Sequence, residues 1–285
     1  MDKSDRFINQ DYLKNDQYQS STNLAARIRL HQLFNTAKEP ITGTIFNFII
    51  DYAPANAKVL GVGSGRGDLW KENAHRVPED WDITLTDMSA GMLQDNQAHI
   101  GEPLINRIRY EVVNAENIPF DDNSFDIVIA NYMLYHVPNR EQALAEIRRV
   151  LKPTGTLFTA TNGKNHMKRL FVLAQAINEG DDFSSIVTDK FSLQNGTAQL
   201  LPFFPDIRIH RFQNDLWVTE AQPILDYIAS MMAIDGMAIL SAKEDEIRDT
   251  LNRLIAQDGG ILIGKETGIF IANGYYDSAT YIHNQ

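Results

Sequence analysis

The sequence contains no cysteine. This absence excludes disulfides, thiolate zinc sites, iron–sulfur clusters and cysteine nucleophiles. Positive charge is also scarce, because 26 lysines and arginines stand against 37 aspartates and glutamates, which gives a net charge of −11. Such a balance disfavours binding to duplex nucleic acid and to anionic membrane surfaces. We therefore expect neither nucleic acid nor a membrane among the partners of this protein.

Long uninterrupted apolar runs are absent as well. The most apolar stretch, residues 223–242, is interrupted by Asp226 and Asp235, which a membrane span would bury at high cost. The residues Met1–Arg6 are polar and mixed in charge, unlike a secretory signal. These features predict a cytoplasmic protein. Its 285 residues, 44% of them hydrophobic, suffice for one large domain with a substantial insertion or cap.

Strands and helices are expected to alternate between residues 58 and 161. Short apolar segments predict strands that begin near residues 58, 81, 108, 125 and 156. Helical spacing predicts helices over residues 68–75, 89–98 and 139–151. Ser89 and Asn139 are expected N-caps, the second with Gln142 in a capping box, and Pro153 is expected just past the end of its helix. This alternation is typical of an α/β fold whose parallel sheet has helices on both faces, called doubly wound.

The flanking segments do not continue this alternation. We predict helices over residues 23–35, 41–52, 166–177, 221–233 and 243–257, and strands over 207–212 and 268–273. The chain is therefore divided into three parts. Residues 1–56 form an N-terminal helical cap, residues 57–163 form the core, and residues 164–285 contribute cap insertions and the last two core strands.

A glycine cluster interrupts the chain where the first core strand ends. Residues 59–67 read V-L-G-V-G-S-G-R-G. A strand, a run of glycines and a helix in this order form a turn that can receive a nucleotide or nucleoside, although a tight turn without a ligand gives the same pattern. Glycine suits it because the backbone turns tightly and no β-carbon blocks a ligand. The dinucleotide fingerprint G-x-G-x-x-G does not fit, because Arg66 or Asp68 would stand at its last position.

The order Gly63-x-Gly65-x-Gly67 resembles instead the glycine loop of class I S-adenosylmethionine-dependent methyltransferases. Four later segments resemble further motifs of that family: Thr86–Ser89 with Gly91–Leu93, Asn114–Phe120 with Asp122–Asp126, Asn131–Val137, and Leu151–Gly155. The resemblance covers residues 58–161, about a third of the chain. It is greatest to the small-molecule branch that includes ubiquinone and menaquinone C-methyltransferases.

This resemblance implies a Rossmann-like core with a seven-stranded, mostly parallel sheet, an antiparallel last strand and S-adenosylmethionine as the cofactor. The cofactor-binding residues that it implies are Gly63, Ser64, Gly65, Gly67, Asp87, Met88, Asn114, Ala115, Glu116, Asn131 and Tyr132. Asp87 can accept the ribose hydroxyls, or it is a plain structural aspartate at the approach to a helix. Gly61 departs from the family, which usually has an acid there to hold the methionine ammonium. Asn114 is a milder departure, since aspartate is common at that position.

The sequence offers fewer candidate residues for binding and activating the methyl acceptor. His136 is the candidate general base, and the competing interpretation is a structural histidine that caps the turn before Pro138. Tyr132 and Tyr135 either shape the acceptor pocket or only pack against the cap. Arg27 and His31 lie one helical turn apart, so we expect one of them to meet the carboxylate of the cofactor, unless this face of the helix is only solvated. Neither a metal-binding spacing nor a nucleophile elbow is found in the sequence.

The sequence thus predicts a methyltransferase for a small, uncharged or cationic acceptor. The alternative is a protein that binds S-adenosylmethionine without transferring the methyl group, as a sensor or assembly partner. An RNA methyltransferase is disfavoured by the negative charge. Residues 223–242 either form the interface of a homodimer or line a pocket.

Overall fold

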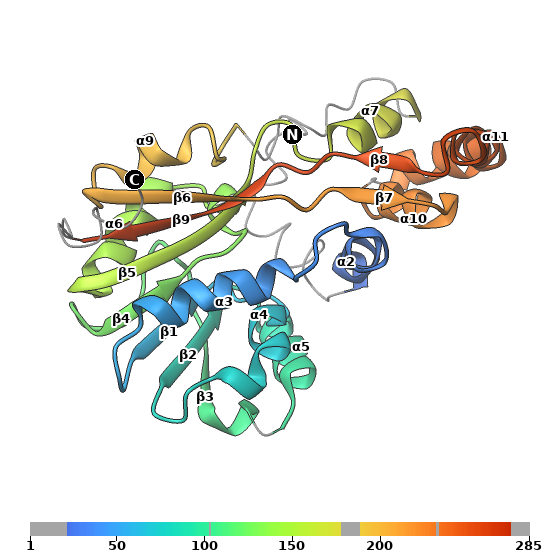
Figure 1. Cartoon of the computed structure of the whole chain (residues 1–285). Helices are drawn as coiled ribbons and strands as arrows, with labels where there is room; N and C mark the ends of the chain where they lie inside the picture. Colours follow the sequence, from blue (N-terminus) through green and yellow to red (C-terminus); the bar gives the residue numbers. More distant parts are fainter. Residues whose placement is uncertain (1–21, 103, 178–188, 232–233, 275–285) are drawn as a thin grey trace.

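The computed structural model describes residues 22–102, 104–177, 189–231 and 234–274 (Figure 1). A seven-stranded sheet in the order β3-β2-β1-β4-β5-β9-β6 forms its centre. The strands are β1 (Lys58–Val62), β2 (Asp82–Asp87), β3 (Ile108–Val112), β4 (Phe125–Ile129), β5 (Leu151–Asn162), β6 (Asp206–Phe212) and β9 (Thr267–Asn273). β1 to β5 pair in parallel, whereas β9 is antiparallel to both β5 and β6. The predicted α/β fold with an antiparallel last strand is confirmed.

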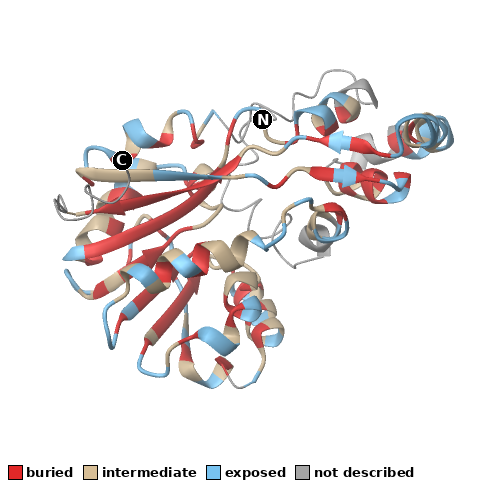
Figure 2. Ribbon diagram, in the orientation of Figure 1, coloured by how far each residue is buried: buried red, intermediate tan, exposed pale blue. Residues whose placement is uncertain are grey.

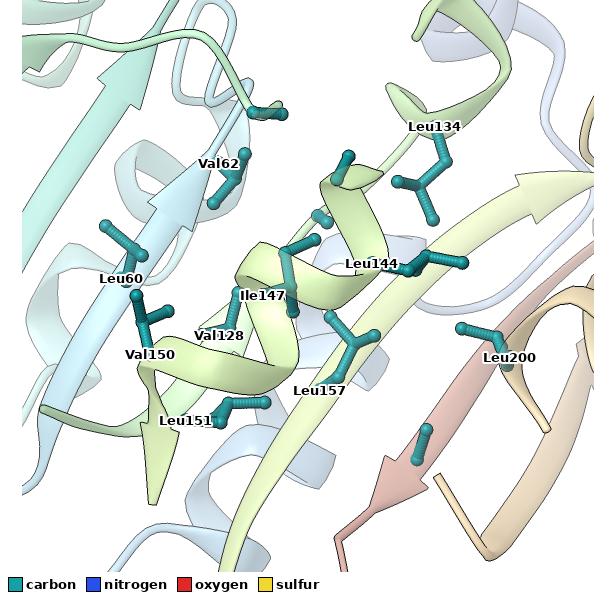
Figure 3. Packing of buried hydrophobic residues seen from close by; sticks show 14 of the residues in the cluster. Leu60, Val62, Val128, Leu134, Leu144, Ile147, Val150, Leu151, Leu157 and Leu200 are labelled. Atoms are coloured by element: carbon teal, nitrogen blue, oxygen red, sulfur yellow. The ribbon is translucent and has the colours of Figure 1, made fainter. Parts of the chain in front are cut away.

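Helices cover both faces of this sheet. They are α3 (Ile41–Tyr52), α4 (Asp68–Glu72), α5 (Ala90–Ile100), α6 (Arg140–Val150) and α9 (Gly196–Leu200), with the short 3-10 helices η3 (Ala74–Arg76), η4 (Leu104–Arg107) and η5 (Leu134–His136). Side chains alternate along a strand, so Leu60 of β1 packs with Ile147 of α6, whereas Val59 joins Ile49 of α3 on the other face. Figure 3 shows the α6 side of this core. Burial on both faces explains why the central strands are almost wholly apolar (Figure 2).

A second region, which we call the cap, stands beyond one edge of the sheet. It consists of α2 (Thr22–Phe34), α7 (Lys168–Ile177), α10 (Ala221–Met231), α11 (Ile234–Asp258) and the antiparallel pair β7 (Leu216–Val218) and β8 (Ile261–Ile263). It has its own hydrophobic cluster, which includes Leu30, Leu170 and Ile224. In Figure 1 the cap lies on the side toward which the arrows of β2 and β5 point. The cap therefore faces the carboxyl ends of the parallel strands, where open α/β sheets bind their ligands.

Two predicted segments differ in the structure, and two short strands were not predicted. Residues 151–155 do not form a turn after a helix but belong to β5, and a register shift between Phe125 and Ile127 accommodates Pro153, which has no N–H to donate. The helix predicted from residue 243 is α11, which begins at Ile234. β7 and β8 were missed, because strands of three residues are too short to show an alternation.

The apolar stretch at residues 223–242 is shared between α10 and α11. Ile224, Leu225 and Ile228 of α10 are buried inside the cap. This part of the stretch is therefore covered by the chain itself and does not offer a surface to a second copy. Within the ranges that the structure describes, no helix is long and apolar enough to cross a membrane.

Candidate functional site

The glycine loop follows β1 and has an unusual backbone. Gly63, Gly65 and Gly67 have φ angles of 62°, 53° and 83°, in the left-handed region that favours glycine. A β-carbon would lie 2.9 Å from Cβ of Met133 if added at Gly63, and 2.8 Å from Nδ2 of Asn96 if added at Gly67. At Gly65 the nearest such atom is 3.7 Å away. Two of the glycines therefore serve the packing of the loop, and the third leaves room for a ligand to approach the backbone.

Ser64 lies close to Gly61, the position at which the resemblance implies an acid. Its backbone N–H donates to the carbonyl of Thr86 at 2.9 Å, which fixes the loop on β2. A β-carbon at Gly61 would lie only 2.5 Å from Oγ of Ser64. This hydroxyl is buried and has no hydrogen-bond partner among the described residues. Cδ2 of Leu85 would lie 2.7 Å from the same β-carbon, so a side chain at residue 61 requires both Ser64 and Leu85 to shift.

Asp87 ends β2 and joins the glycine loop to α5. Its Oδ2 accepts from the N–H of Gly65 at 3.0 Å, and its Oδ1 accepts from the N–H of Ser89 at 3.0 Å. Burial raises the pKa of the Asp87 carboxyl, while backbone N–H donors, including that of Met88, oppose the rise. Each carboxylate oxygen has a further lone pair. Asp87 can therefore hold the loop and still accept from the hydroxyls of a ligand.

The loop after β3 lies beside this carboxylate. The N–H of Val113 donates to the carbonyl of Asp87 at 3.0 Å, which brings Asn114 to the same edge of the sheet. Oδ1 of Asn114 turns back and accepts from the N–H of Glu116 at 3.0 Å. Ala115, between them, is buried. The three residues predicted here thus form a tight turn next to Asp87.

The N-terminus of α6 shows one correction to the sequence analysis. Asn139 is the N-cap as predicted, and its Oδ1 accepts from the N–H of Gln142 at 3.1 Å. The N–H of Asn139 itself donates to Oε1 of Glu116 at 2.7 Å. Glu116 therefore plays the part that the predicted capping box gave to the Gln142 side chain, and this contact joins the turn after β3 to α6.

The carboxyl end of β4 carries the next predicted residues. Oδ1 of Asn131 accepts from the N–H of Ala160 at 2.9 Å, and the N–H of Tyr132 donates to the carbonyl of Ala160 at 2.8 Å. Tyr132 has a φ of 56°, which is rare for a bulky residue and is found where a surrounding structure enforces it. Burial raises the pKa of its phenol. His136 ends η5, and its ring lies edge-on to that of Tyr135, with 4.5 Å between centroids.

The sheet order gathers these groups at one place. Because β3, β2, β1 and β4 are adjacent and parallel, their carboxyl ends lie side by side, about 4.8 Å from strand to strand. The glycine loop, Asp87, Asn114 and Asn131 follow these four ends in turn. The structure thus brings the predicted core residues together along a single edge.

The two residues predicted from the N-terminal helix lie in the cap. Nε and Nη2 of Arg27 donate to Oγ and the carbonyl oxygen of Ser230, at 3.1 Å and 2.8 Å. The guanidinium of Arg27 is therefore hydrogen-bonded to α10. His31 lies edge-on to Tyr227, with 6.1 Å between ring centroids. Burial, with a contribution from the charge of Lys265, lowers the pKa of His31 to about 3.

Sequence analysis missed two polar residues of the cap, His166 and Lys265. Burial lowers the pKa of His166 well below its usual value, and the charges of His31 and Lys265 lower it further. Burial also lowers the pKa of Lys265 to about 8, while the charge of Asp215 opposes this. Neither residue stands in a recognisable motif. The only signal in the sequence was that His166 closely follows the last parallel strand.

Comparison with known proteins was made for sequence and for structure. Residues 60–159 match the family model described as a methyltransferase domain. Over 105 residues the chain is 38% identical to the ubiquinone/menaquinone biosynthesis C-methyltransferase UbiE of Hydrogenovibrio crunogenus, a match that covers 36% of this chain and 41% of the relative. The match thus spans less than half the length of that relative.

Two solved structures show the same fold at low identity. The YcgJ protein of Bacillus subtilis aligns with a TM-score of 0.55 and 20% identity, over 81% of this chain and 98% of its own. The [4+2]-cyclase SpnF aligns with a TM-score of 0.53 and 17% identity, over 91% of this chain and 85% of its own. These likenesses extend well beyond the segment that matches the family model.

Proposed function

Since the core of this chain is a class I S-adenosylmethionine-dependent methyltransferase domain similar to that of UbiE, we propose that the protein methylates a small-molecule acceptor. The observation that carries the proposal is the hydrogen bond of 3.0 Å between Asp87 and the N–H of Gly65. It fixes a carboxylate beside an open stretch of glycine backbone, which is the arrangement that a ribose with two hydroxyls requires.

The residues along this edge fit an adenosine group. Gly65 leaves room for a close approach, and Asp87 keeps lone pairs for the ribose hydroxyls. Met88 and the turn of Asn114, Ala115 and Glu116 would flank the adenine. The sulfonium of the bound cofactor supplies an activated methyl group. The chain itself must therefore bind the acceptor, orient it and limit the access of water.

The acceptor would reach this edge from the side of the cap. Asn131 and Tyr132 directly follow β4, which neighbours β1 and its glycine loop, and His136, the candidate base named from the sequence, ends the following helix η5. A net charge of −11 favours a small molecule over nucleic acid or a membrane surface. We place the reaction in the cytoplasm. A homodimer also remains a proposal, and it requires a surface other than the buried face of α10.

Calorimetry and a product assay test this function together. S-adenosylmethionine should bind the wild-type chain, and the Asp87→Ala variant should bind it far more weakly. Incubation with methyl-labelled cofactor and a small-molecule extract should then release S-adenosylhomocysteine and label a small molecule. Absence of cofactor binding would refute the proposal, and so would binding of equal strength by the variant.

A second candidate function is cofactor binding without methyl transfer, as a sensor or assembly partner. The observation that favours it is the pair Gly61 and Ser64, which leaves no acid for the methionine ammonium at the usual position. A lost hydrogen bond to a charged group corresponds to about 1.5–3 kcal/mol. The fold does not distinguish methyl transfer from cofactor binding alone, since one of its structural neighbours is named as a cyclase. Binding without any S-adenosylhomocysteine production would favour this candidate.

A further inference from the structure

Three groups able to carry positive charge meet inside the cap. We call His31, His166 and Lys265 the basic junction. His31 belongs to α2, His166 follows β5, and Lys265 stands between β8 and β9. The charges of Lys265 and His31 affect the pKa of His166, so the three groups lie within electrostatic reach of one another. Each is largely enclosed by protein and keeps part of its surface exposed.

The segment that carries His166 is fastened to the segment that carries Lys265. The N–H of Gly163 donates to the carbonyl of Glu266 at 2.7 Å, and the N–H of Met167 donates to the carbonyl of Gly264 at 3.0 Å. The carboxylate of Glu266 lies across Gly163, where a β-carbon would clash with it, and accepts from the N–H of Asn165 at 2.9 Å. These contacts hold His166 and Lys265 in a fixed relation.

The end of α2 is tied to the same place through Asp215. Oδ1 of Asp215 accepts from the N–H of Lys265 at 2.8 Å, while its backbone carbonyl accepts from the N–H of Thr36 at 2.9 Å. Asn35 and Leu216 form an isolated β-bridge beside it. The basic junction is therefore built by long-range hydrogen bonds between four chain segments and is not an accident of surface side chains.

Both histidines of the junction offer an acceptor atom that the protein does not use. Nδ1 of His31 and Nδ1 of His166 are buried and have no hydrogen-bond partner among the described residues. The backbone carbonyl of Glu266 accepts a hydrogen bond from the ring of His166, and because Nδ1 has no partner, we assign the lone pair of the neutral ring to Nδ1. A buried polar atom without a partner is costly in free energy. A ligand that donates a hydrogen bond would remove this cost.

The junction lies on the acceptor side of the proposed methyl-transfer site. β5 lies two strand spacings, about 10 Å, from β1, and it extends four residues, about 13 Å, beyond Phe158, which pairs with the last residue of β4, Ile129. β5 ends at Asn162, and His166 follows at the same edge of the sheet.

We propose that the basic junction binds an acidic hydroxyl group of the acceptor, on an unsaturated carbon as in a phenol or an enol, and that His166 takes its proton. This inference rests on the proposed function. The O–H bond breaks, its proton moves to Nδ1 of His166, and the ammonium of Lys265 stabilises the oxyanion. The electron pair of the anion forms the bond to the methyl carbon, and the pair of the broken carbon–sulfur bond stays on sulfur.

Acceptors that carry an amine, a carboxylate or a saturated alcohol fit the charges of the basic junction less well than a phenol or an enol. An amine is protonated in water, and the charge of Lys265 would repel it. A carboxylate is already ionised and brings no proton to the imidazoles. A saturated alcohol is too weakly acidic to form an oxyanion beside one ammonium group. The junction thus disfavours the cationic acceptors that the composition left open.

Para-nitrophenol tests the proposal directly, because its visible absorption reports its ionisation. The full chain is loaded with S-adenosylhomocysteine and titrated with the phenol at a pH below the pKa of the phenol in solution. The wild-type chain should bind it as the phenolate, with its pKa lowered by about 1–3 units. Lys265→Met should abolish this shift, whereas Lys265→Arg, which keeps the charge, should retain most of it.

The His166→Gln variant tests the proton acceptor. Glutamine can keep the hydrogen bond to the Glu266 carbonyl but is not a base, so the bound phenol should stay neutral. The affinity for S-adenosylhomocysteine should not change, which shows that the variant is folded. His75→Gln and Lys243→Met, both at exposed positions, serve as matched controls and should behave as the wild type.

Each other outcome overturns the proposal. Wild-type protein that binds S-adenosylhomocysteine but not the phenol, or binds the phenol in neutral form, contradicts the junction alone. Loss of the phenolate in His136→Gln but not in His166→Gln assigns the base to His136. Failure of S-adenosylhomocysteine to bind the wild-type chain refutes the proposed function, and the inference falls with it.

Discussion

The edge of the sheet at Asp87 and the basic junction of the cap differ in whether their buried polar atoms have hydrogen-bond partners within the protein. Both oxygens of Asp87 accept backbone N–H groups, so the edge holds its shape without a ligand. At the junction, Nδ1 of His31 and Nδ1 of His166 have no partner among the described residues. The first arrangement suits a site that binds one fixed cofactor. The second suits a site whose polar groups are completed only by its substrate.

The largest expected effect concerns the backbone at the sheet edge. Gly65→Val should abolish binding of S-adenosylmethionine while the chain still folds, because a β-branched side chain disfavours the φ of 53° and fills the ligand approach. Calorimetry and thermal unfolding measure the two effects. Gly43→Ala is the matched control, since Gly43 is helical and has no atom within 4 Å of an added β-carbon. Normal binding by Gly65→Val would show that the loop does not cradle the ligand.

A gain of affinity should follow when the missing acid is supplied. Gly61→Asp alone places a β-carbon 2.5 Å from Oγ of Ser64, so we expect it to destabilise the fold. The double variant Gly61→Asp with Ser64→Ala removes the contact with this hydroxyl, and the side chain of Leu85, whose Cδ2 would lie 2.7 Å from the new β-carbon, then has to shift. This variant should bind S-adenosylmethionine about tenfold more tightly, as one charged hydrogen bond predicts. An unchanged dissociation constant in the double variant would mean that another group already holds the ammonium.

Acid should destabilise the cap through its neutral histidines. The folded-state pKa of His31 is about 3, below the value of 6.5 expected for the unfolded chain. The unfolded state therefore binds the extra proton, and stability is lost as the pH falls from 6.5 toward 3, by at most about 1.4 kcal/mol for each pH unit and each histidine. His31→Asn should reduce this slope in urea unfolding, whereas His75→Asn, at an exposed position, should not. Equal slopes in both variants would show that His31 protonates freely in the fold.

The smallest effect separates two roles for Arg27. The structure joins its guanidinium to Ser230, so Arg27→Met should lower the free energy of unfolding by about 1–2 kcal/mol. The dissociation constant for S-adenosylmethionine should stay within about twofold. If Arg27 instead meets the carboxylate of the cofactor, as the sequence suggested, the constant should rise about tenfold or more. Calorimetry on this one variant decides between the two.

The two regions also differ in how far the sequence alone describes them. The strands and helices of the core, the N-cap at Ser89 and the place of Asp87 follow from local patterns, because neighbouring residues determine them. The junction depends on hydrogen bonds between residues about a hundred positions apart, such as Gly163 and Glu266. The spacing of residues within a short segment of sequence does not indicate such long-range contacts. β7 and β8 were not predicted either, because strands of three residues are too short to show an alternation.

The edge at Asp87 is proposed to bind the cofactor, and the junction at His166 is proposed to carry out the acceptor chemistry. Calorimetric titration of S-adenosylhomocysteine into Asp87→Ala, His166→Gln and the wild-type chain tests this division most directly. Asp87→Ala loses a carboxylate that orients the loop, so its dissociation constant should rise about tenfold to a hundredfold, while that of His166→Gln should equal the wild-type value. Equal affinity in Asp87→Ala and the wild type, or a comparable loss in His166→Gln, would contradict the account.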